Sequence, residues 1–235
     1  MQRDVPLVAG ETYHVFNRGA HKRTIFTNNS DYQRFMLLLL LANHSESINL
    51  RDLFIHYKGR SFVDIFQEEK PDKSLVEMLA YNLMPNHFHL VVRQKGDAGV
   101  TIFMKKIATA YSMYFNTKYG HSGTLFQGRF KSRHVGTEPY FRYIFSYVHL
   151  NSLDLFEPGW EEKGLRDLNG ARRYINSYPY SSFFDYSGND RAEKALLSLS
   201  QAPEFLTTEN DLEVLLSTFT KVGPLYGVGI NSAGQ

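Results

Sequence analysis

The most constraining feature of the chain is the segment Ala80–Gln94 (AYNLMPNHFHLVVRQ), which is centred on the paired histidines of His87–His89. Successive side chains of a β-strand point to opposite faces, so a strand here sends both imidazoles to one side and Phe88 to the other. The preceding Met84–Asn86 contains a proline, whose fixed φ suits a turn and interrupts a ladder. The segment therefore predicts a β-hairpin whose second strand opens with a paired-histidine face.

Two imidazoles on one face are typical of a divalent metal site, but such a site needs at least one further ligand. The other interpretation is structural, with one histidine capping the turn and its neighbour sitting in a satisfied core. The hairpin by itself leaves both interpretations open, and the decision depends on residues about sixty positions downstream.

Length and composition bound the remaining possibilities. A chain of 235 residues fits one sizeable domain, or one domain with an appendage. It contains no cysteine, which excludes disulfides and thiolate ligands, and it shows neither a signal-peptide pattern nor an apolar run that could span a bilayer. We therefore expect a cytoplasmic protein without a membrane partner.

Charge and pattern divide the chain in two. Residues 187–235 hold six acidic residues against three basic ones, whereas the whole chain carries a formal charge of +2. The body at 1–186 is therefore mildly basic, which tolerates a polyanion without requiring one. We expect the body to form the functional domain and 187–235 to be an accessory segment with one helix near Asn210–Thr220.

The first half of the body predicts a strand and a helix. Thr12–Asn17 is rich in β-forming residues and ends at an Arg-Gly pair, which is typical of a strand. Ser30 followed by Gln33 resembles a capping box, so a mostly apolar helix is expected over Tyr32–Asn43. Residues 44–74 show no clear period, and we interpret them as an excursion between core elements.

A long helix and a basic stretch follow the hairpin. Val100–Tyr119 has helical periodicity and leaves Lys105 and Lys106 available to solvent. Within Lys118–His134 there is no acidic residue, and aromatic side chains alternate with cations. Such a pattern is typical of single-stranded nucleic-acid binding, although a solvated charged strand has the same composition. The candidate DNA-binding residues are Lys105, Lys106, Phe126, Arg129, Lys131 and Arg133.

The last helix of the body begins at Thr137, an N-cap residue type followed by an acid and a proline. It continues through Tyr140–Leu150 and is closed by Asn151. Tyr143, Tyr147 and Asn151 recur every four residues, so they share one face of this helix.

Three segments together resemble one family. LMPNHFHLVV, GTLFQGRFKSR and YIFSYVHLN occur here in the order and at the spacing of the IS200-like tyrosine transposases, which include the REP-associated tyrosine transposases. These enzymes are single-strand DNA nucleases named for their histidine–hydrophobic–histidine motif. The resemblance runs from about Tyr13 to about Tyr186, and the chain departs from the compact family pattern in 44–74 and after 186.

The resemblance implies a fold, a site and a substrate. The implied fold is α+β, an antiparallel sheet with helices packed on one face (ferredoxin-like or RRM-like), here with a C-terminal helical extension. His87 and His89 match the metal-binding histidines, Asn151 matches the third ligand of an Mg²⁺ or Mn²⁺ ion, and Tyr147 matches the nucleophile. The implied substrate is single-stranded DNA with a hairpin, such as an element end or a REP palindrome in the nucleoid of a bacterium. A homodimer is compatible with the family.

Other functions remain open on sequence alone. A domesticated protein that binds DNA hairpins without cutting would need neither the histidines nor Tyr147. A replication initiator or relaxase of the wider nuclease group often carries two tyrosines or the reverse histidine order. A metallohydrolase acting on another substrate class is disfavoured, because no carboxylate motif or Gly-rich phosphate loop accompanies the histidines.

Overall fold

The computed structural model describes residues 6–45, 55, 58–68, 73–201, 204 and 212–222. Its centre is a four-stranded antiparallel sheet with the strand order β2-β3-β1-β4. The elements follow one another as β-α-β-β-α-β, which is the split arrangement of ferredoxin-like folds. The bounds of these six elements are β1 Thr12–Arg18, α1 Asn29–Leu41, β2 Val76–Met84, β3 His87–Gln94, α4 Gly99–Tyr119 and β4 Lys131–His134.

The predicted α+β class, the histidine hairpin and the long helix after it are confirmed, and the ferredoxin-like order follows from this topology. The helix predicted over Tyr32–Asn43 is α1, which ends two residues earlier, at Leu41, and begins at Asn29, before the predicted Ser30 cap. The reason is Asp31, which is fully buried and accepts hydrogen bonds from the backbone amides of Thr27 and Asn28. Asn28 is the N-cap and Asp31 completes its capping box, so the helix begins at Asn29 and the expected capping role of Gln33 is not used.

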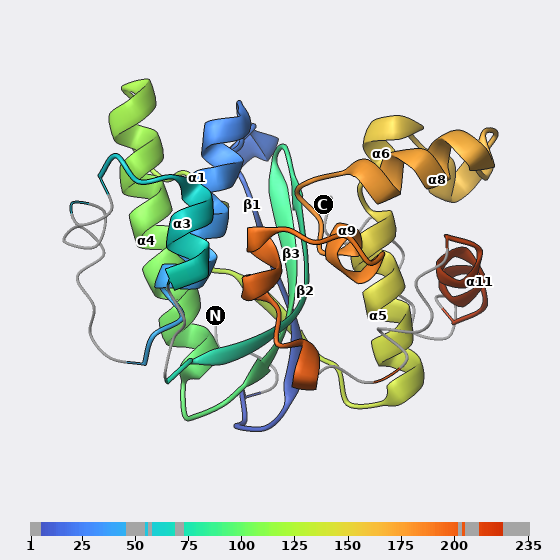
Figure 1. Cartoon of the computed structure of the whole chain (residues 1–235), viewed down its shortest axis with the longest axis horizontal. Coiled ribbons are helices and arrows are strands. Elements are labelled where there is room, and N and C mark those ends of the chain that lie inside the picture. Colours follow the sequence, from blue (N-terminus) through green and yellow to red (C-terminus); the bar gives the residue numbers. More distant parts are fainter. Residues whose placement is uncertain are drawn as a thin grey trace.

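Helices cover both faces of the sheet (Figure 1). The first face carries α1 and α4, and its core includes ring contacts of Phe35 with Phe88 and Tyr111. The opposite face carries α5 (Glu138–Leu150), which contacts β2 and β3. Helices were expected on one face of the sheet. That expectation holds for α1 and α4, but α5 covers the opposite face, which carries the histidines.

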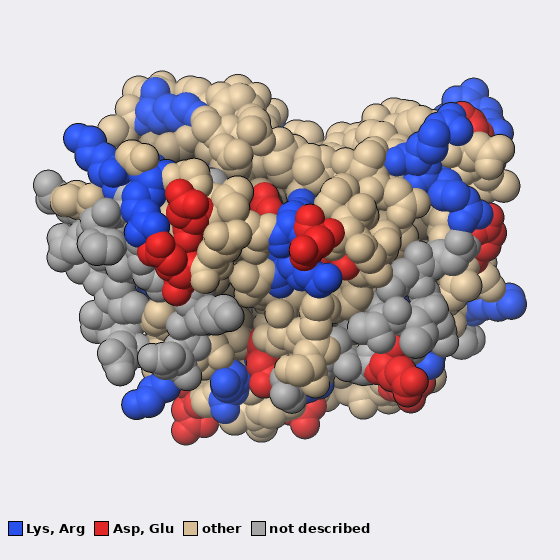
Figure 2. Space-filling model, in the orientation of Figure 1, with Lys and Arg blue, Asp and Glu red and all other residues tan. Residues whose placement is uncertain are grey.

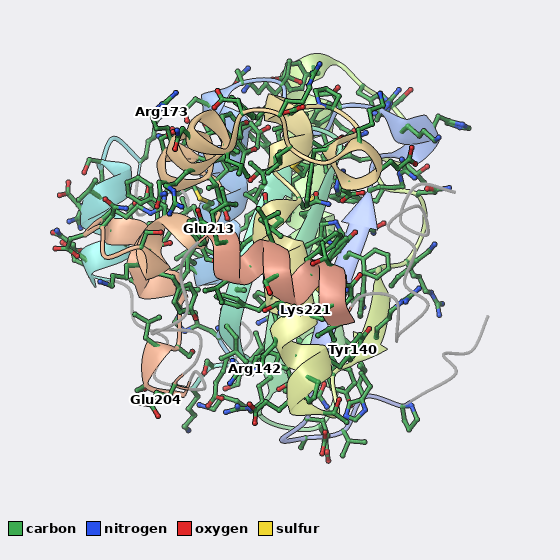
Figure 3. All side chains as sticks on the ribbon, turned by 90° about the vertical axis from the view of Figure 1, so that its right-hand side faces the viewer. Tyr140, Arg142, Arg173, Glu204, Glu213 and Lys221 are labelled. Atoms are coloured by element: carbon green, nitrogen blue, oxygen red, sulfur yellow. The ribbon has the colours of Figure 1, made fainter. Side chains whose placement is uncertain are left out.

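Helix α5 is buried nearly all round, because a second layer lies outside it. Figure 3 shows α11 (Leu212–Val222) lying across α5. Between the two helices the ring of Phe219 stacks on that of Tyr143, with 5.8 Å between the ring centroids. The ring of Trp160 also contacts that of Phe219, at 5.4 Å. A helix that is apolar on all sides needs partners on all sides, and α11 is the outer partner of α5.

The described residues between 187 and 201 pack onto the domain. Leu196 and Leu197 are buried in the common core, and the amide of Ser198 donates to the carbonyl of Met78 at 2.9 Å. Arg191 pairs with the buried carboxylate of Asp185 at 2.7 Å. These contacts stabilise the domain. The helix predicted for residues 187–235 is confirmed as α11.

Shorter helices complete the described structure. In the excursion, α3 buries Ile65 and Phe66 against the core, whereas residues 46–54, 56–57 and 69–72 lie outside the described residues. Among the described residues no helix is both long and apolar enough to cross a membrane. The short elements are η1 Ala20–Lys22, α3 Phe62–Glu68, α6 Leu153–Phe156, α7 Trp160–Lys163, α8 Leu168–Ser177, α9 Phe183–Tyr186, η2 Ala192–Leu196 and η3 Leu199–Gln201.

Candidate active site

The sheet register gathers the candidate residues on one face. His89 of β3 lies opposite Phe16 of β1 and opposite Asn82 of β2, and His87 lies opposite Arg18. Directly paired residues of an antiparallel ladder project to the same side. The side chains of these five residues therefore share the face that α5 covers, as the alternation in the hairpin predicts.

The environment of His87 determines its protonation. Asn86 donates from its Nδ2 to the carbonyl of Lys22 at 3.4 Å, so its Oδ1 is the atom that accepts from His87 Nδ1–H at 2.6 Å. With the proton on Nδ1, the Nε2 of His87 carries a lone pair, and it faces Oδ1 of Asn151 at 3.0 Å. Burial lowers the pKa of His87 to about 4, while the contact with Asn151 opposes that shift. The ring is therefore neutral near pH 7.

His89 is fully buried between two other imidazoles. Its ring centroid lies 5.1 Å from that of His87 and 5.1 Å from that of His14, a residue of β1. Nδ1 of His89 is 2.9 Å from Nε2 of His14, whereas Nε2 of His89 has no hydrogen-bond partner among the described residues. Desolvation, with the two neighbouring histidines adding to it, lowers the pKa of His89 well below its usual value.

His14 is a site residue that the sequence analysis missed. It is 4% exposed, and burial together with the charge of Arg133 lowers its pKa to about 3. The sequence shows only a histidine in an apolar strand, TYHVFN, which is more often a core residue. A signal was nevertheless available. Side chains two residues apart in a strand lie on the same face, so a histidine in β1 could share a face with the two histidines of β3 if the two strands were neighbours.

Tyr147 reaches the histidines from α5. Its ring centroid lies 5.2 Å from that of His89 and 5.8 Å from that of His14, in both cases edge-on. Desolvation, followed by the negative charge of Glu161, raises the pKa of the Tyr147 hydroxyl above its usual value, while Arg133 opposes the shift. The amide of Asn151 donates to the carbonyl of Tyr147 at 3.0 Å, so the two residues are one helical turn apart.

A small cavity of about 20 Å³ opens beside His87 and His89. A space of this size holds one water or one small ion. No group of three or more histidine, cysteine or carboxylate side chains among the described residues is arranged around a metal. Both histidines line this cavity, whereas Asn151, the predicted third ligand, contacts His87 without lining it.

The edge strand β4 brings two of the predicted DNA-binding cations to the site. Lys131 pairs with Phe16 and Arg133 with His14, so both project from the histidine face. Lys131 also lines the small cavity. Arg129 precedes β4 and is exposed.

The other predicted DNA-binding residues lie elsewhere. Lys105 and Lys106 are on α4, across the sheet from the histidines, and Lys106 donates to the carbonyl of His44 at 2.7 Å. Phe126 is only 7% exposed, and its ring packs against Phe88 at 6.0 Å and against Tyr111 at 6.3 Å. The structure does not bring these three residues together with the histidine face.

A second, open hollow of about 290 Å³ adjoins the first and shares Arg18 and Gln127 with it. His21 and Lys22 line this hollow, both with left-handed backbone (φ of 54° and 60°). Non-glycine residues in this conformation store strain and are concentrated at functional sites. Sequence analysis did not single out His21 or Lys22, whereas the candidate DNA-binding residue Phe126 also lines this hollow. On the face drawn in Figure 2, basic and acidic groups are interspersed.

Comparison with known proteins agrees with this geometry. The family model described as "Transposase IS200 like" matches residues 8–151. The structure of a REP-associated tyrosine transposase bound to a REP hairpin is similar with a TM-score of 0.50 and 14% identity, covering 80% of this chain and 86% of that one. A putative transposase from Deinococcus radiodurans has a TM-score of 0.33 and 15% identity, covering 63% of this chain and 95% of that one.

None of the curated proteins compared with the chain matches it. The family match nevertheless covers more than half of the sequence and contains the histidine pair, the basic strand and the tyrosine helix. The fold agrees with that of the REP-associated enzyme. The chain belongs to the family of IS200-like transposases.

Proposed function

We propose that the protein is a metal-dependent single-stranded DNA transposase that cuts and rejoins DNA through a 5′-phosphotyrosine on Tyr147. The observation that carries this proposal is the meeting of strand β3 with helix α5: the ring of Tyr147 lies 5.2 Å from that of His89, and Asn151, one turn later, contacts His87. A nucleophile, two imidazoles and an amide oxygen thus lie together, and both histidines line the small cavity.

The residues fit a divalent metal. Nε2 of His87 and Oδ1 of Asn151 face each other at 3.0 Å with lone pairs on both atoms, a contact that a cation between them would stabilise. Neighbouring ligands of an octahedral ion with bonds of about 2.1 Å are separated by about 3.0 Å. Nε2 of His89, which is buried and has no hydrogen-bond partner in the described part of the chain, supplies a third donor. Two imidazoles favour Mn²⁺ somewhat over Mg²⁺.

A bound ion would polarise the scissile phosphate and stabilise the charge that develops on it. The chain supplies the rest of the reaction. The Tyr147 oxygen forms a bond to phosphorus as its proton departs, the P–O3′ bond breaks, and the 3′-oxygen leaves and takes up a proton. The phosphotyrosine keeps the energy of the phosphodiester, so a second 3′-OH can reverse the step and join strands without ATP.

The DNA is expected to approach along β4. Lys131 and Arg133 present positive charge on the histidine face, and phosphate neutralisation of this kind dominates nucleic-acid affinity. The similar structure of the REP-associated enzyme holds a REP hairpin. We therefore propose hairpin-containing single strands as substrate. Because Tyr147 and His89 of one copy meet, we further propose that each copy cuts with its own tyrosine.

The test is adduct formation with single-stranded hairpin DNA labelled at its 3′ end, with Mn²⁺ or with EDTA. The wild type should form a covalent, labelled adduct that requires metal, and peptide mapping should place it on Tyr147. Tyr147→Phe should bind metal and DNA normally and form no adduct. His87→Ala should lose metal binding and cleavage together.

The matched control is Tyr143→Phe, one turn earlier on the same face of α5 and also buried. It should keep the adduct. An adduct formed by Tyr147→Phe would refute the assigned nucleophile. Hairpin binding by the wild type with no adduct under any metal would instead favour a DNA-binding protein that does not cut.

A further inference from the structure

We propose that His14 is a positioning residue that fixes His89 in the tautomer able to bind a metal. This inference rests on the proposed function, because it concerns one ligand of the proposed metal site. Its starting point is a pair of fully desolvated imidazoles on neighbouring strands, joined nitrogen to nitrogen at 2.9 Å.

The geometry of the pair comes from the sheet. His14 lies opposite Val91, two residues after His89 on the same face, so the two rings are diagonal neighbours across the β1–β3 ladder. Their planes are nearly parallel, with an angle of 21°. Neither ring can turn freely, since Phe16 stacks on His14 at 5.0 Å and Tyr147 borders both rings.

The hydrogen bond between Nε2 of His14 and Nδ1 of His89 contains one proton, which belongs to one of the two rings. A neutral imidazole carries a proton on one nitrogen and a lone pair on the other. If His14 donates from Nε2, then His89 accepts at Nδ1 and carries its own proton on Nε2. That proton occupies the nitrogen that the proposed metal requires, so this tautomer cannot be a ligand.

The reverse arrangement leaves the site ready for metal. If His89 donates from Nδ1–H, then Nε2 of His14 accepts and Nε2 of His89 presents its lone pair. Ligating histidines generally donate their second N–H to such a partner, which fixes the ring orientation and raises ligand basicity. His14 would then carry its proton on Nδ1, an atom without a hydrogen-bond partner in the described part of the chain.

His14 is better suited to this role than to that of a ligand. Nε2 of His14 is already 2.9 Å from Nδ1 of His89, the nitrogen of His89 that the proposed metal does not use. Nor do His14, His87 and His89 count as a group of three that could hold a metal within the described residues. The direct contact is with the ligand His89, so the expected effect of His14 is on metal affinity.

The experiment measures Mn²⁺ binding by calorimetry to the full chain without DNA. His14→Phe, which keeps an aromatic ring but has no acceptor, should weaken Mn²⁺ binding about 10- to 100-fold. His14→Gln can accept from His89 through its amide oxygen and should restore most of the loss. A space-filling role predicts the reverse order, with phenylalanine better tolerated than glutamine.

His149 provides the matched control. It is also fully buried, its Nε2 contacts Oγ of Ser182 at 2.7 Å, and its Nδ1 likewise has no partner among the described residues. His149→Phe therefore removes an equally buried imidazole that does not contact His89. The folded fraction of this variant should bind Mn²⁺ with the affinity of the wild type. Equal affinity of wild type and His14→Phe would overturn the inference.

A second measurement uses the wild type alone and so does not depend on a variant that folds. Nitrogen-15 NMR of the histidine rings with saturating Mg²⁺ should show the proton of His89 on Nδ1 and that of His14 also on Nδ1. A proton on Nε2 of His14 in the metal-bound protein would overturn the inference while leaving the proposed function intact. A wild type that binds neither Mn²⁺ nor Mg²⁺ would refute the proposed metal site, and the inference with it.

Discussion

A buried side-chain amide joins the sheet to helix α5, which carries Tyr147. Asn82 lies in β2, directly opposite His89 in the register, and is fully buried. Its Nδ2 donates to the carbonyl of Val148 in the last turn of α5 at 2.7 Å. Because Val148 lies between Tyr147 and Asn151, we predict that Asn82→Ala both destabilises the fold and misplaces the site.

The cost follows from the contacts that are lost. A buried amide hydrogen bond contributes about 1 kcal/mol, and leaving the Val148 carbonyl without this donor costs a further 1–3 kcal/mol or so. The small cavity left by the shortened side chain adds to this. Oδ1 of Asn82 has no partner among the described residues, so its removal returns part of the cost. We expect a net loss of about 2–4 kcal/mol in the free energy of unfolding.

Two assays separate the consequences. In urea unfolding, the midpoint should fall by roughly 1 M for a chain of this size, while the m-value should stay unchanged. Adduct formation, measured at a temperature where the variant is fully folded, should fall by about 10- to 100-fold, since a displacement of about 1 Å costs that much when groups must be aligned.

Asn189→Ala is the matched control, because Asn189 also donates from Nδ2 to one helix carbonyl, that of Phe184 at 2.9 Å, far along the chain from the site residues. It should cost about 1 kcal/mol and leave adduct formation unchanged. A loss below about 0.5 kcal/mol in Asn82→Ala, with normal adduct formation, would show that α5 is held by its other contacts alone.

Further predictions concern DNA affinity, pH, subunit exchange and the outer helix. Three alanine substitutions remove the cations near the edge strand: Arg129, Lys131 and Arg133. The triple variant should bind all single strands more weakly, with a salt dependence shallower by about 0.7 per lost phosphate contact; an unchanged slope would support a merely solvated strand. Burial raises the pKa of Glu161 to about 7, so the folded state holds this proton more tightly than the unfolded state. Stability should therefore fall by about 1–3 kcal/mol as pH rises from about 4.5 to about 7, and Glu161→Gln should remove that fall in urea titrations followed against pH. Mixing Tyr147→Phe with His87→Ala should restore no cleavage, whereas recovery would mean that copies share active sites. Phe219→Ala should cost about 2–4 kcal/mol in thermal unfolding yet leave the Mn²⁺ affinity of the folded protein unchanged; a loss of metal binding would make α11 part of the site.

Several features of the site could be predicted because they are local. Alternation along β3 places His87 and His89 on one side whatever surrounds the strand. Helical spacing similarly places Tyr147 and Asn151 one turn apart. The resemblance to the transposase family added the expectation that these two pairs meet, and the structure brings them together.

The cations show the limit of reasoning from composition. Lys131, Arg133 and Lys106 look equivalent in the sequence, since each is basic and lies near aromatic residues. The fold separates them: β4 pairs with β1 and turns the first two toward the histidines, while α4 carries Lys106 on the far side of the sheet. Phe126 was expected to face DNA, but the core needs its ring beside Phe88.

By itself, the sequence determined which residues share a strand face or a helix face, because those relations repeat every two residues or every turn. The tertiary structure alone decided which faces meet. The contact of His14 with His89 spans 75 residues of sequence and that of Asn82 with Val148 spans 66. Neither pair leaves a periodic trace, because hydrogen bonds between distant elements depend on strand order, register and the layer outside α5. Those are properties of the packed chain, and they place His14 against His89 and Asn82 against the last turn of α5.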